Sequence, residues 1–233
     1  MESNFVVPDL AIKYILLQRT DLQRYHGIAN KLRVPYYPYI YSIEAFLRRK
    51  RIKQGFVQQI LEDYEIIKPY LHKNVSKILD IGCGVAGIDV FLYENYGCSS
   101  ELEFFLLDRT EVSNKVYYMF EREAAFYNSL EAAKLMLLSN GIKEKQIHLI
   151  SVKPDYQISL SSVDLVISLI SWGYHYPISV YLEKVYELLN WGGKLIVDVR
   201  KGSDGEDELR QKFKTIEPIL EDEKRLRFVA VKV

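Results

Sequence analysis

Several features are scarce in this chain of 233 residues, and each scarcity excludes a class of protein. Only 2 cysteines are present, so we expect no disulfide framework and a protein that resides in a reducing compartment. Basic and acidic residues number 31 each, and a formal net charge of zero argues against a general polyanion binder. No run approaches the roughly 18 apolar residues of a membrane span, and the first residues carry acids where a signal peptide needs a basic start. We therefore expect a cytoplasmic protein without a membrane span.

The first third of the chain differs from the rest in charge and in pattern. Residues 1–75 contain 12 of the 31 basic residues but only 7 of the 31 acidic ones. Apolar spacing predicts helices over residues 8–33, from Ser42 into the basic cluster Arg48–Lys53, and over 54–72. Prolines at positions 35 and 38 exclude a regular helix in the tyrosine-rich stretch 34–41. We predict a helical cap over residues 1–74 and a separate α/β domain over 75–233.

The segment Lys77–Tyr96 carries the strongest signal. A short apolar strand over 77–81 is followed by Gly82, Gly84 and Gly87, and then by a helix over 87–96. This order is typical of the first β-α turn of a nucleotide-binding fold, whose glycines allow a tight turn and close approach of a ligand. A second apolar run, 102–107, ends in Asp108, about 20 residues past the glycines, where this fold class places its ribose-binding acid.

The rest of the chain continues the alternation of strands and helices. We predict a helical section over 111–140, strands over 146–152 and 163–169, a helix over 178–189 and a strand over 194–199. Two further strand-like runs, 213–219 and 227–233, have no helix between them and should pair as an antiparallel hairpin at the sheet edge. The pattern predicts a doubly wound, mostly parallel sheet of seven strands.

Together these motifs resemble the class I S-adenosylmethionine-dependent methyltransferases. The resemblance covers about residues 75–233 and rests on the Asp80–Gly87 turn, Asp108, the strand 163–169 and the segment Leu188–Leu195. It implies a Rossmann-like methyltransferase fold and S-adenosylmethionine as the cofactor. More faintly, Tyr127–Glu131 and the helix around it resemble bacterial sugar and surface-glycan O-methyltransferases.

The resemblance also implies a set of cofactor-binding residues. Asp108 would bind both ribose hydroxyls, and Asp80 would order the glycine turn or reach the ammonium of the methionine part. The third strand departs from the family pattern, because Ser151, Val152 and Lys153 stand where an acid is usual, so adenine recognition falls to backbone groups or Asp155. The implied cofactor-binding residues are Asp80, Gly82, Cys83, Gly84, Gly87, Asp108, Arg109, Ser151, Val152, Ser168 and Leu169.

A hydroxyl acceptor needs a base, and the best candidate is His175, just past the fourth predicted strand. A histidine that packs against the cofactor without taking a proton is an equal alternative. Tyr174 and His26 are the other catalytic candidates. The rings of Tyr36, Tyr37, Tyr39 and Tyr41 would stack on a sugar or join the cap to the domain, and the cluster Arg48–Lys53 would bind a phosphate or form a solvated face.

Several functional readings stay open at this stage. The leading one is O-methylation of a sugar, glycan or other small-molecule hydroxyl by a monomer or homodimer. Others are an RNA or protein methyltransferase, a non-catalytic methyltransferase-like binding subunit, and an NAD-dependent oxidoreductase using the same turn. No convincing metal-binding constellation is present in the sequence, so we predict no metal.

Overall fold

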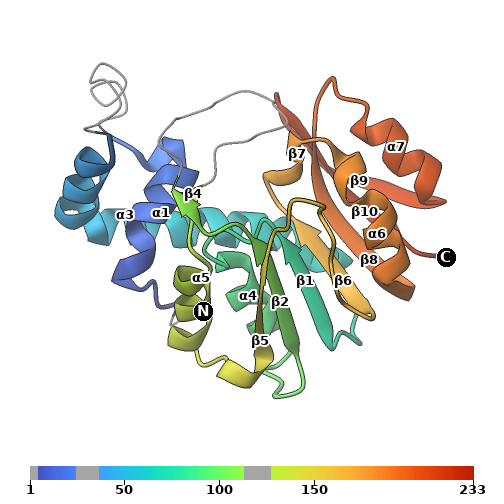
Figure 1. Ribbon diagram of the computed structural model, residues 1–233, viewed down its shortest axis with the longest axis horizontal. Coiled ribbons are helices and arrows are strands. Elements are labelled where there is room, and N and C mark those ends of the chain that lie inside the picture. The colour runs from blue at the N-terminus through green and yellow to red at the C-terminus, as the bar shows by residue number, and fades with distance from the viewer. Residues whose placement is uncertain (1–4, 25–36, 113–126) are drawn as a thin grey trace.

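The computed structural model describes residues 5–24, 37–112 and 127–233, and its centre is a seven-stranded sheet (Figure 1). The strand order is β5-β2-β1-β6-β8-β10-β9. All neighbours pair in parallel except β10, which is antiparallel to both β8 and β9. The predicted mostly parallel sheet with a C-terminal hairpin is therefore confirmed. The strands are β1 (Lys77–Ile81), β2 (Glu103–Asp108), β5 (Ile147–Ser151), β6 (Val163–Ser168), β8 (Leu189–Arg200), β9 (Thr215–Glu221) and β10 (Arg225–Val231).

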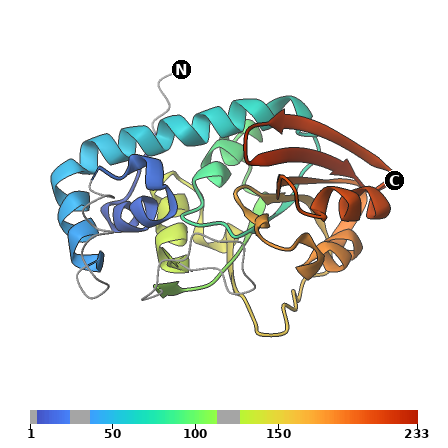
Figure 2. The same ribbon diagram turned by 90° about the horizontal axis from the view of Figure 1, so that it is seen from above.

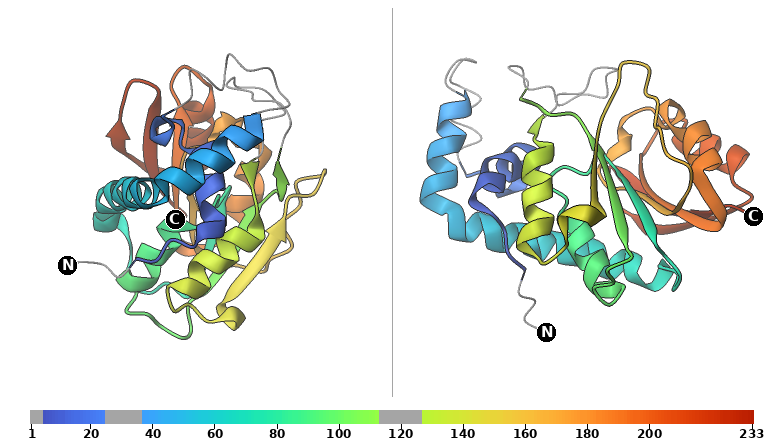
Figure 3. Two further views of the ribbon diagram at one scale, coloured as in Figure 1. Left: turned by 90° about the vertical axis from the view of Figure 1, so that its left-hand side faces the viewer. Right: turned by 60° about the horizontal axis from the view of Figure 1, so that its bottom comes forward.

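Helices cover both faces of the sheet. Among the described residues, four helices lie on one face, where α1 packs between α3 and α5 (Figure 3) and α4 packs on α3 and α5. Two shorter helices, α6 and α7, cover the other face together with the 3₁₀ turn η5. The bounds are α1 (Asp9–Gln18), α3 (Tyr37–Ile67), α4 (Gly87–Asn95), α5 (Leu130–Ser139), α6 (Leu182–Leu188), α7 (Gly205–Lys212) and η5 (Ile178–Val180). The part of the chain that the structure describes also contains the 3₁₀ turns η1 (Thr20–Leu22), η3 (Lys68–Tyr70) and η4 (Glu144–Gln146).

The apolar runs of the strands explain this three-layer arrangement. Successive side chains of a strand point to opposite faces, so Ile78 packs under α1, α3, α4 and α5, while Leu79 packs under α6 and α7. Phe104 and Phe105 divide in the same way on β2. A strand buried on both faces reads as a continuous apolar run rather than an alternating one, as these strands do.

The longest helix, α3, runs along one side of the molecule from α1 to the C-terminal hairpin (Figure 2). The sequence prediction of a non-helical stretch followed by two helices was wrong here. Pro38 lies in the first turn of α3, where its missing amide costs no intrahelical hydrogen bond. The predicted helix 8–33 is also too long, since α1 ends at Gln18 and η1 follows.

Two other segments differ from the prediction. The expected helix over 111–140 is wrong at its beginning, because β3 (Glu111–Val112) pairs with β4 (Tyr127–Asn128) in a separate two-stranded sheet. Helix α5 begins only at Leu130, where the hydroxyl of Ser129 accepts from the amide of Ala132 at 3.3 Å. The unpredicted strand β7 (Ser171–Tyr176) packs beside β8, and α7 precedes the hairpin. Within the described ranges, no helix has the length and apolar character required to cross a bilayer.

Candidate functional site

A cavity of about 790 Å³ opens at the carboxyl ends of β1, β2, β5 and β6. The chain leaves β1 toward β2 on one side and reaches β6 on the other, and open α/β sheets bind ligands at such a switch point. The volume lies within the range of small-molecule sites. Residues from α1, α3, β7, β8 and the β9–β10 hairpin also line the cavity.

The glycine turn after β1 forms one wall of the cavity. Gly82 and Gly84 have φ of 72° and 56°, a region that side chains disfavour. The amide of Gly82 donates to the carbonyl of Leu107 at 2.7 Å, and the amide of Gly84 donates to Oδ2 of Asp108 at 2.9 Å. The turn is therefore held by β2 and the acid that ends it.

The space beside these glycines is occupied by side chains of the protein itself. A Cβ on Gly84 would lie 2.8 Å from Oε1 of Gln18, the last residue of α1, and one on Gly82 would overlap Ser171. A Cβ on Gly87 would lie 2.5 Å from the ring of Phe56 in α3. The absence of a side chain at Gly87 therefore allows α3 to approach the glycine turn closely.

Asp108 lines the cavity, and both of its carboxylate oxygens accept hydrogen bonds from backbone amides. Its second oxygen, Oδ1, accepts from the amide of Arg109 at 2.7 Å. Asn128, whose Oδ1 accepts from the side chain of Gln18 at 3.3 Å, lies near the carboxyl group and lowers its pKa. Burial raises the pKa of Asp108 to about 6, although these hydrogen bonds act in the opposite direction. A carboxylate oxygen has more than one acceptor direction, so the group retains capacity for a ligand hydroxyl.

A pair of buried acids also adjoins the cavity. Asp80 on β1 faces Asp89 in the first turn of α4, and both are almost fully buried. Burial, followed by the charge of Asp89, raises the pKa of Asp80 well above its usual range, and burial raises that of Asp89 to about 7. Apart from the backbone of Asp89 itself, Asp80 is the described group that meets the Asp89 carboxyl, so a proton on Asp80 can join the two side chains.

The opposite wall comes from β7 and the neighbouring strand ends. Tyr174 and His175 line the cavity there, with Arg200 lying 5.5 Å from the centre of the Tyr174 ring. His175 is exposed at this wall, and partial desolvation together with the charge of Arg200 lowers its pKa below the ordinary histidine value. His175 is therefore neutral at neutral pH.

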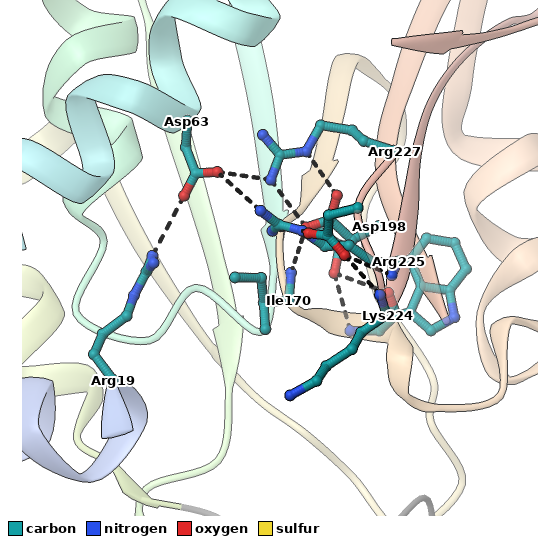
Figure 4. Close-up of polar contacts among 10 residues, drawn as sticks. Arg19, Asp63, Ile170, Asp198, Lys224, Arg225 and Arg227 are labelled. Atoms are coloured by element: carbon teal, nitrogen blue, oxygen red, sulfur yellow. Dashed lines mark hydrogen bonds and ion pairs between the residues drawn. The ribbon is translucent and has the colours of Figure 1, made fainter. Parts of the chain in front are cut away.

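A network of ion pairs lies behind this wall (Figure 4). The guanidinium of Arg227 donates to both oxygens of Asp198, at 2.6 and 3.0 Å, and to Oδ1 of Asp63 at 2.8 Å. Arg225 binds Asp198 at 2.9 Å, and Arg19 approaches Asp63 at 3.6 Å. These contacts join α1, α3, β8 and the C-terminal hairpin around the cavity.

Most of the residues predicted for the site lie in this cavity. The lining includes the predicted residues Asp80, Gly82, Cys83, Gly84, Gly87, Asp108, Val152, Leu169, Tyr174 and His175.

Three predicted cofactor-binding residues do not line it. The hydroxyl of Ser168 donates to the carbonyl of Ile81 at 2.8 Å and accepts from the amide of Trp172 at 3.0 Å, so it joins β1, β6 and β7. Ser151 is exposed at the end of β5, and Arg109 contributes its amide to Asp108. His26 and Tyr36 lie outside the described residues, as do the side chains of Tyr37, Tyr39 and Tyr41.

Other cavity residues were not identified from the sequence. They are far from the glycine turn along the chain and carry no local signal, because only the fold brings α1, α3 and the hairpin to the cavity. The unpredicted lining residues include Gln18, Arg19, Asp63, Asn128, Ser171, Arg200, Lys224 and Arg225.

The basic cluster predicted from the sequence forms ion pairs: Arg48 binds Glu44, while Arg49 and Lys53 pair with Asp9. Among the residues described, no three histidine, cysteine or acidic side chains form a group suited to a metal ion.

Comparisons with known proteins support the fold assignment. No family model and no curated protein sequence matches the chain. Among solved structures, a candidate O-methyltransferase from Nostoc punctiforme PCC 73102 superposes with a TM-score of 0.53 at 16% identity, over 99% of this chain and 74% of that one. The S-adenosylmethionine-dependent methyltransferase SibL gives 0.53 at 14% identity, over 96% and 70%.

A third similar structure is the precorrin-6y C5,15-methyltransferase of Geobacter metallireducens GS-15. It gives a TM-score of 0.50 at 15% identity, over 72% of this chain and 85% of that one. At these identities the likeness concerns the backbone. The chain has the Rossmann-like fold of these methyltransferases, with a buried acid and a glycine turn facing one cavity.

Proposed function

We propose that this protein is an S-adenosylmethionine-dependent methyltransferase that methylates a hydroxyl group of a sugar, glycan or other small molecule. The observation that carries the proposal is the position of Asp108, buried at the end of β2, bonded to the glycine turn and facing the cavity. Three similar folds belong to proteins named as established or candidate methyltransferases, which supports the same reading.

The cavity residues fit such a cofactor. Asp108 keeps acceptor capacity for the two ribose hydroxyls, and the backbone of Gly82 and Gly84 would flank the methionine part. Asp80, which lines the cavity, would meet its ammonium, and the cation would favour the ionised form of this acid. Val152, after β5, would border the adenine.

When bound, this cofactor supplies a methyl group on a positively charged sulfur, which an acceptor oxygen can displace. The protein must then align the acceptor and remove its hydroxyl proton. His175 is neutral at neutral pH and borders the cavity, so its imidazole is free of the proton that would prevent it from acting as a base. Tyr174 beside it would position the acceptor ring.

Calorimetric titration with S-adenosylmethionine, S-adenosylhomocysteine and NAD tests the proposal. We expect micromolar binding of the first two and none of NAD. Binding of NAD alone would indicate an oxidoreductase, and binding of none of the three would overturn the proposed cofactor. An Asp155→Asn variant provides a control: the sequence made Asp155 a candidate for binding adenine, but this acid is exposed and does not line the cavity.

A further inference from the structure

The wall of the cavity nearest the C-terminal hairpin is basic. Arg200 at the end of β8, Lys224 in the β9–β10 turn and Arg225 at the start of β10 all line it. They converge from two strand ends and the turn between β9 and β10, on the side of the cavity that also holds Tyr174 and His175. We call these three residues the basic wall.

The acids closest to the basic wall are already paired with arginines, one of which is Arg225 of the wall itself. Asp198 is bound by Arg227 and Arg225, and Asp63 is bound by Arg227, with Arg19 at 3.6 Å. Asp222 accepts from the guanidinium of Arg225 at 2.7 Å. These acids therefore offer little charge to balance Lys224.

Lys224 is an exposed residue that lines the cavity, and its backbone is fixed in the turn. Its amide donates to Oδ1 of Asp222 at 2.8 Å, and its carbonyl accepts from the amide of Lys201 at 2.9 Å, which fixes the backbone of the turn. Its side chain extends away from the cluster of ion pairs (Figure 4). Among the residues that the structure describes, the ammonium of Lys224 has no acidic partner within ion-pair distance.

We propose that the basic wall binds an anionic group, a carboxylate or a phosphate, of the methyl acceptor, with Lys224 as its principal contact. This inference rests on the proposed methyltransferase function and specifies its substrate class. Lysine and arginine donate charge-assisted hydrogen bonds to both kinds of anion. An acceptor fixed at this wall would carry its hydroxyl toward Tyr174 and His175 and toward the cofactor end of the cavity.

The test compares three compounds that share one sugar framework and differ in charge: glucose, glucuronate and glucose 6-phosphate. Binding of each is measured by calorimetry with the protein saturated with S-adenosylhomocysteine and again without it. We expect at least one anionic probe to bind and glucose to bind at least tenfold more weakly. Lys224→Gln should weaken the anionic probe by about 10-fold or more, which is the usual contribution of a charged hydrogen bond, and leave the affinity for S-adenosylhomocysteine unchanged.

Lys201→Gln is the matched control, because Lys201 lies near the same turn but pairs with Glu221 at 2.6 Å and does not line the cavity. A preference between the two anionic probes identifies the group as carboxylate or phosphate. No binding of either anionic probe, equal binding of glucose, or equal effects of Lys224→Gln and Lys201→Gln would overturn the inference. Failure of S-adenosylhomocysteine to bind would instead overturn the proposed function. The two failures can be distinguished, because binding of the probes is also measured without S-adenosylhomocysteine.

Discussion

The guanidinium of Arg227 lies 2.8 Å from the carboxylate of Asp63, although 163 residues separate the two along the chain. Arg227 belongs to β10 and Asp63 to α3, so the contact joins the C-terminal hairpin to the long helix of the N-terminal part. Arg227 is fully buried and also binds Asp198, while Asp63 is 5% exposed. The walls of the cavity thus depend on a buried ionic network between distant parts of the chain.

Replacing Arg227 by alanine should strongly destabilise the protein. The change leaves two buried carboxylates with fewer partners, and breaking a buried pair from one side typically costs about 3–5 kcal/mol. Denaturant unfolding measures the loss. Lys201→Ala is the control, because it removes a half-exposed pair with Glu221 that should contribute less than about 1 kcal/mol. Equal losses in the two variants would show that the Arg227 network does not stabilise the fold.

Gly87→Ala should destabilise the contact between α3 and α4. The added methyl group would lie 2.5 Å from the Phe56 ring, and overpacking of a core usually costs about 1–3 kcal/mol. Phe56→Leu provides space, so the double variant should lose less stability than the two single losses combined. Additive losses in a double-mutant cycle would exclude this steric explanation.

The central strands were predictable because each is buried on both faces and appears as an uninterrupted apolar run. Strand β1 begins and ends as predicted, and the hairpin differs by two residues at each end. The errors occur where tertiary contacts decide the structure. Pro38 is tolerated in the first turn of α3, and β7 depends on packing against β8. The pairing of β3 with β4 takes the place of the first part of the helix expected over 111–140.

The site was predictable only where its residues follow a strand in sequence. Gly82, Gly84 and Asp108 come directly after β1 or at the end of β2, and a general rule of open α/β sheets places them together. Gln18 and Lys224 come from elements far along the chain, and nothing in their local sequence indicates that they meet the glycine turn and the switch point. Their part in the site depends on the packing of α1 and of the hairpin.

The buried acids predict an unusual pH dependence of stability. The pKa of Asp89 rises from 3.8 to about 7 on folding, so between these values the folded state binds more protons than the unfolded state. The free energy of unfolding should therefore fall as pH rises through this window, by about 1.4 kcal/mol per pH unit for each such proton. Asp108, with a pKa of about 6, adds a change of the same sign.

Asp89→Asn should remove the contribution of Asp89 and make the fall in stability between about pH 4 and pH 7 less steep, while Asp80 and Asp108 keep their contributions. Urea unfolding at a series of pH values measures the slope. Glu94→Gln, an exposed change on the same helix, should keep the wild-type slope. A wild-type stability that rises across this window, or a slope that Asp89→Asn leaves unchanged, would contradict the raised pKa.

Asp108→Asn should weaken binding of S-adenosylhomocysteine by about 10- to 100-fold, because a neutral amide replaces a charged acceptor of two ribose hydroxyls. The variant has nearly the same shape, and calorimetry at neutral pH gives the affinity. Asp155→Asn should bind as the wild type does. Affinity that survives in Asp108→Asn would remove this residue from the cofactor site.

The protonation state of His175 can be tested without the acceptor. Only 4 histidines are present, so the imidazole signals are few enough to assign by single substitutions and to follow by NMR against pH. We expect His175 to titrate below 6.5, because its surroundings and the charge of Arg200 both disfavour the imidazolium. Arg200→Met should raise this pKa, whereas Arg210→Met, on exposed α7, should not.

The same titration links the proposed base to the basic wall. An anion bound by Lys224 would oppose the field of Arg200, so glucose 6-phosphate or glucuronate should raise the pKa of His175 toward the range of an effective base. Glucose should leave it unchanged. A pKa at or above 6.5 in the free protein would contradict the first expectation. A pKa unaffected by an anion that binds would place that anion away from His175, and the acceptor would then have to reach the base by another route.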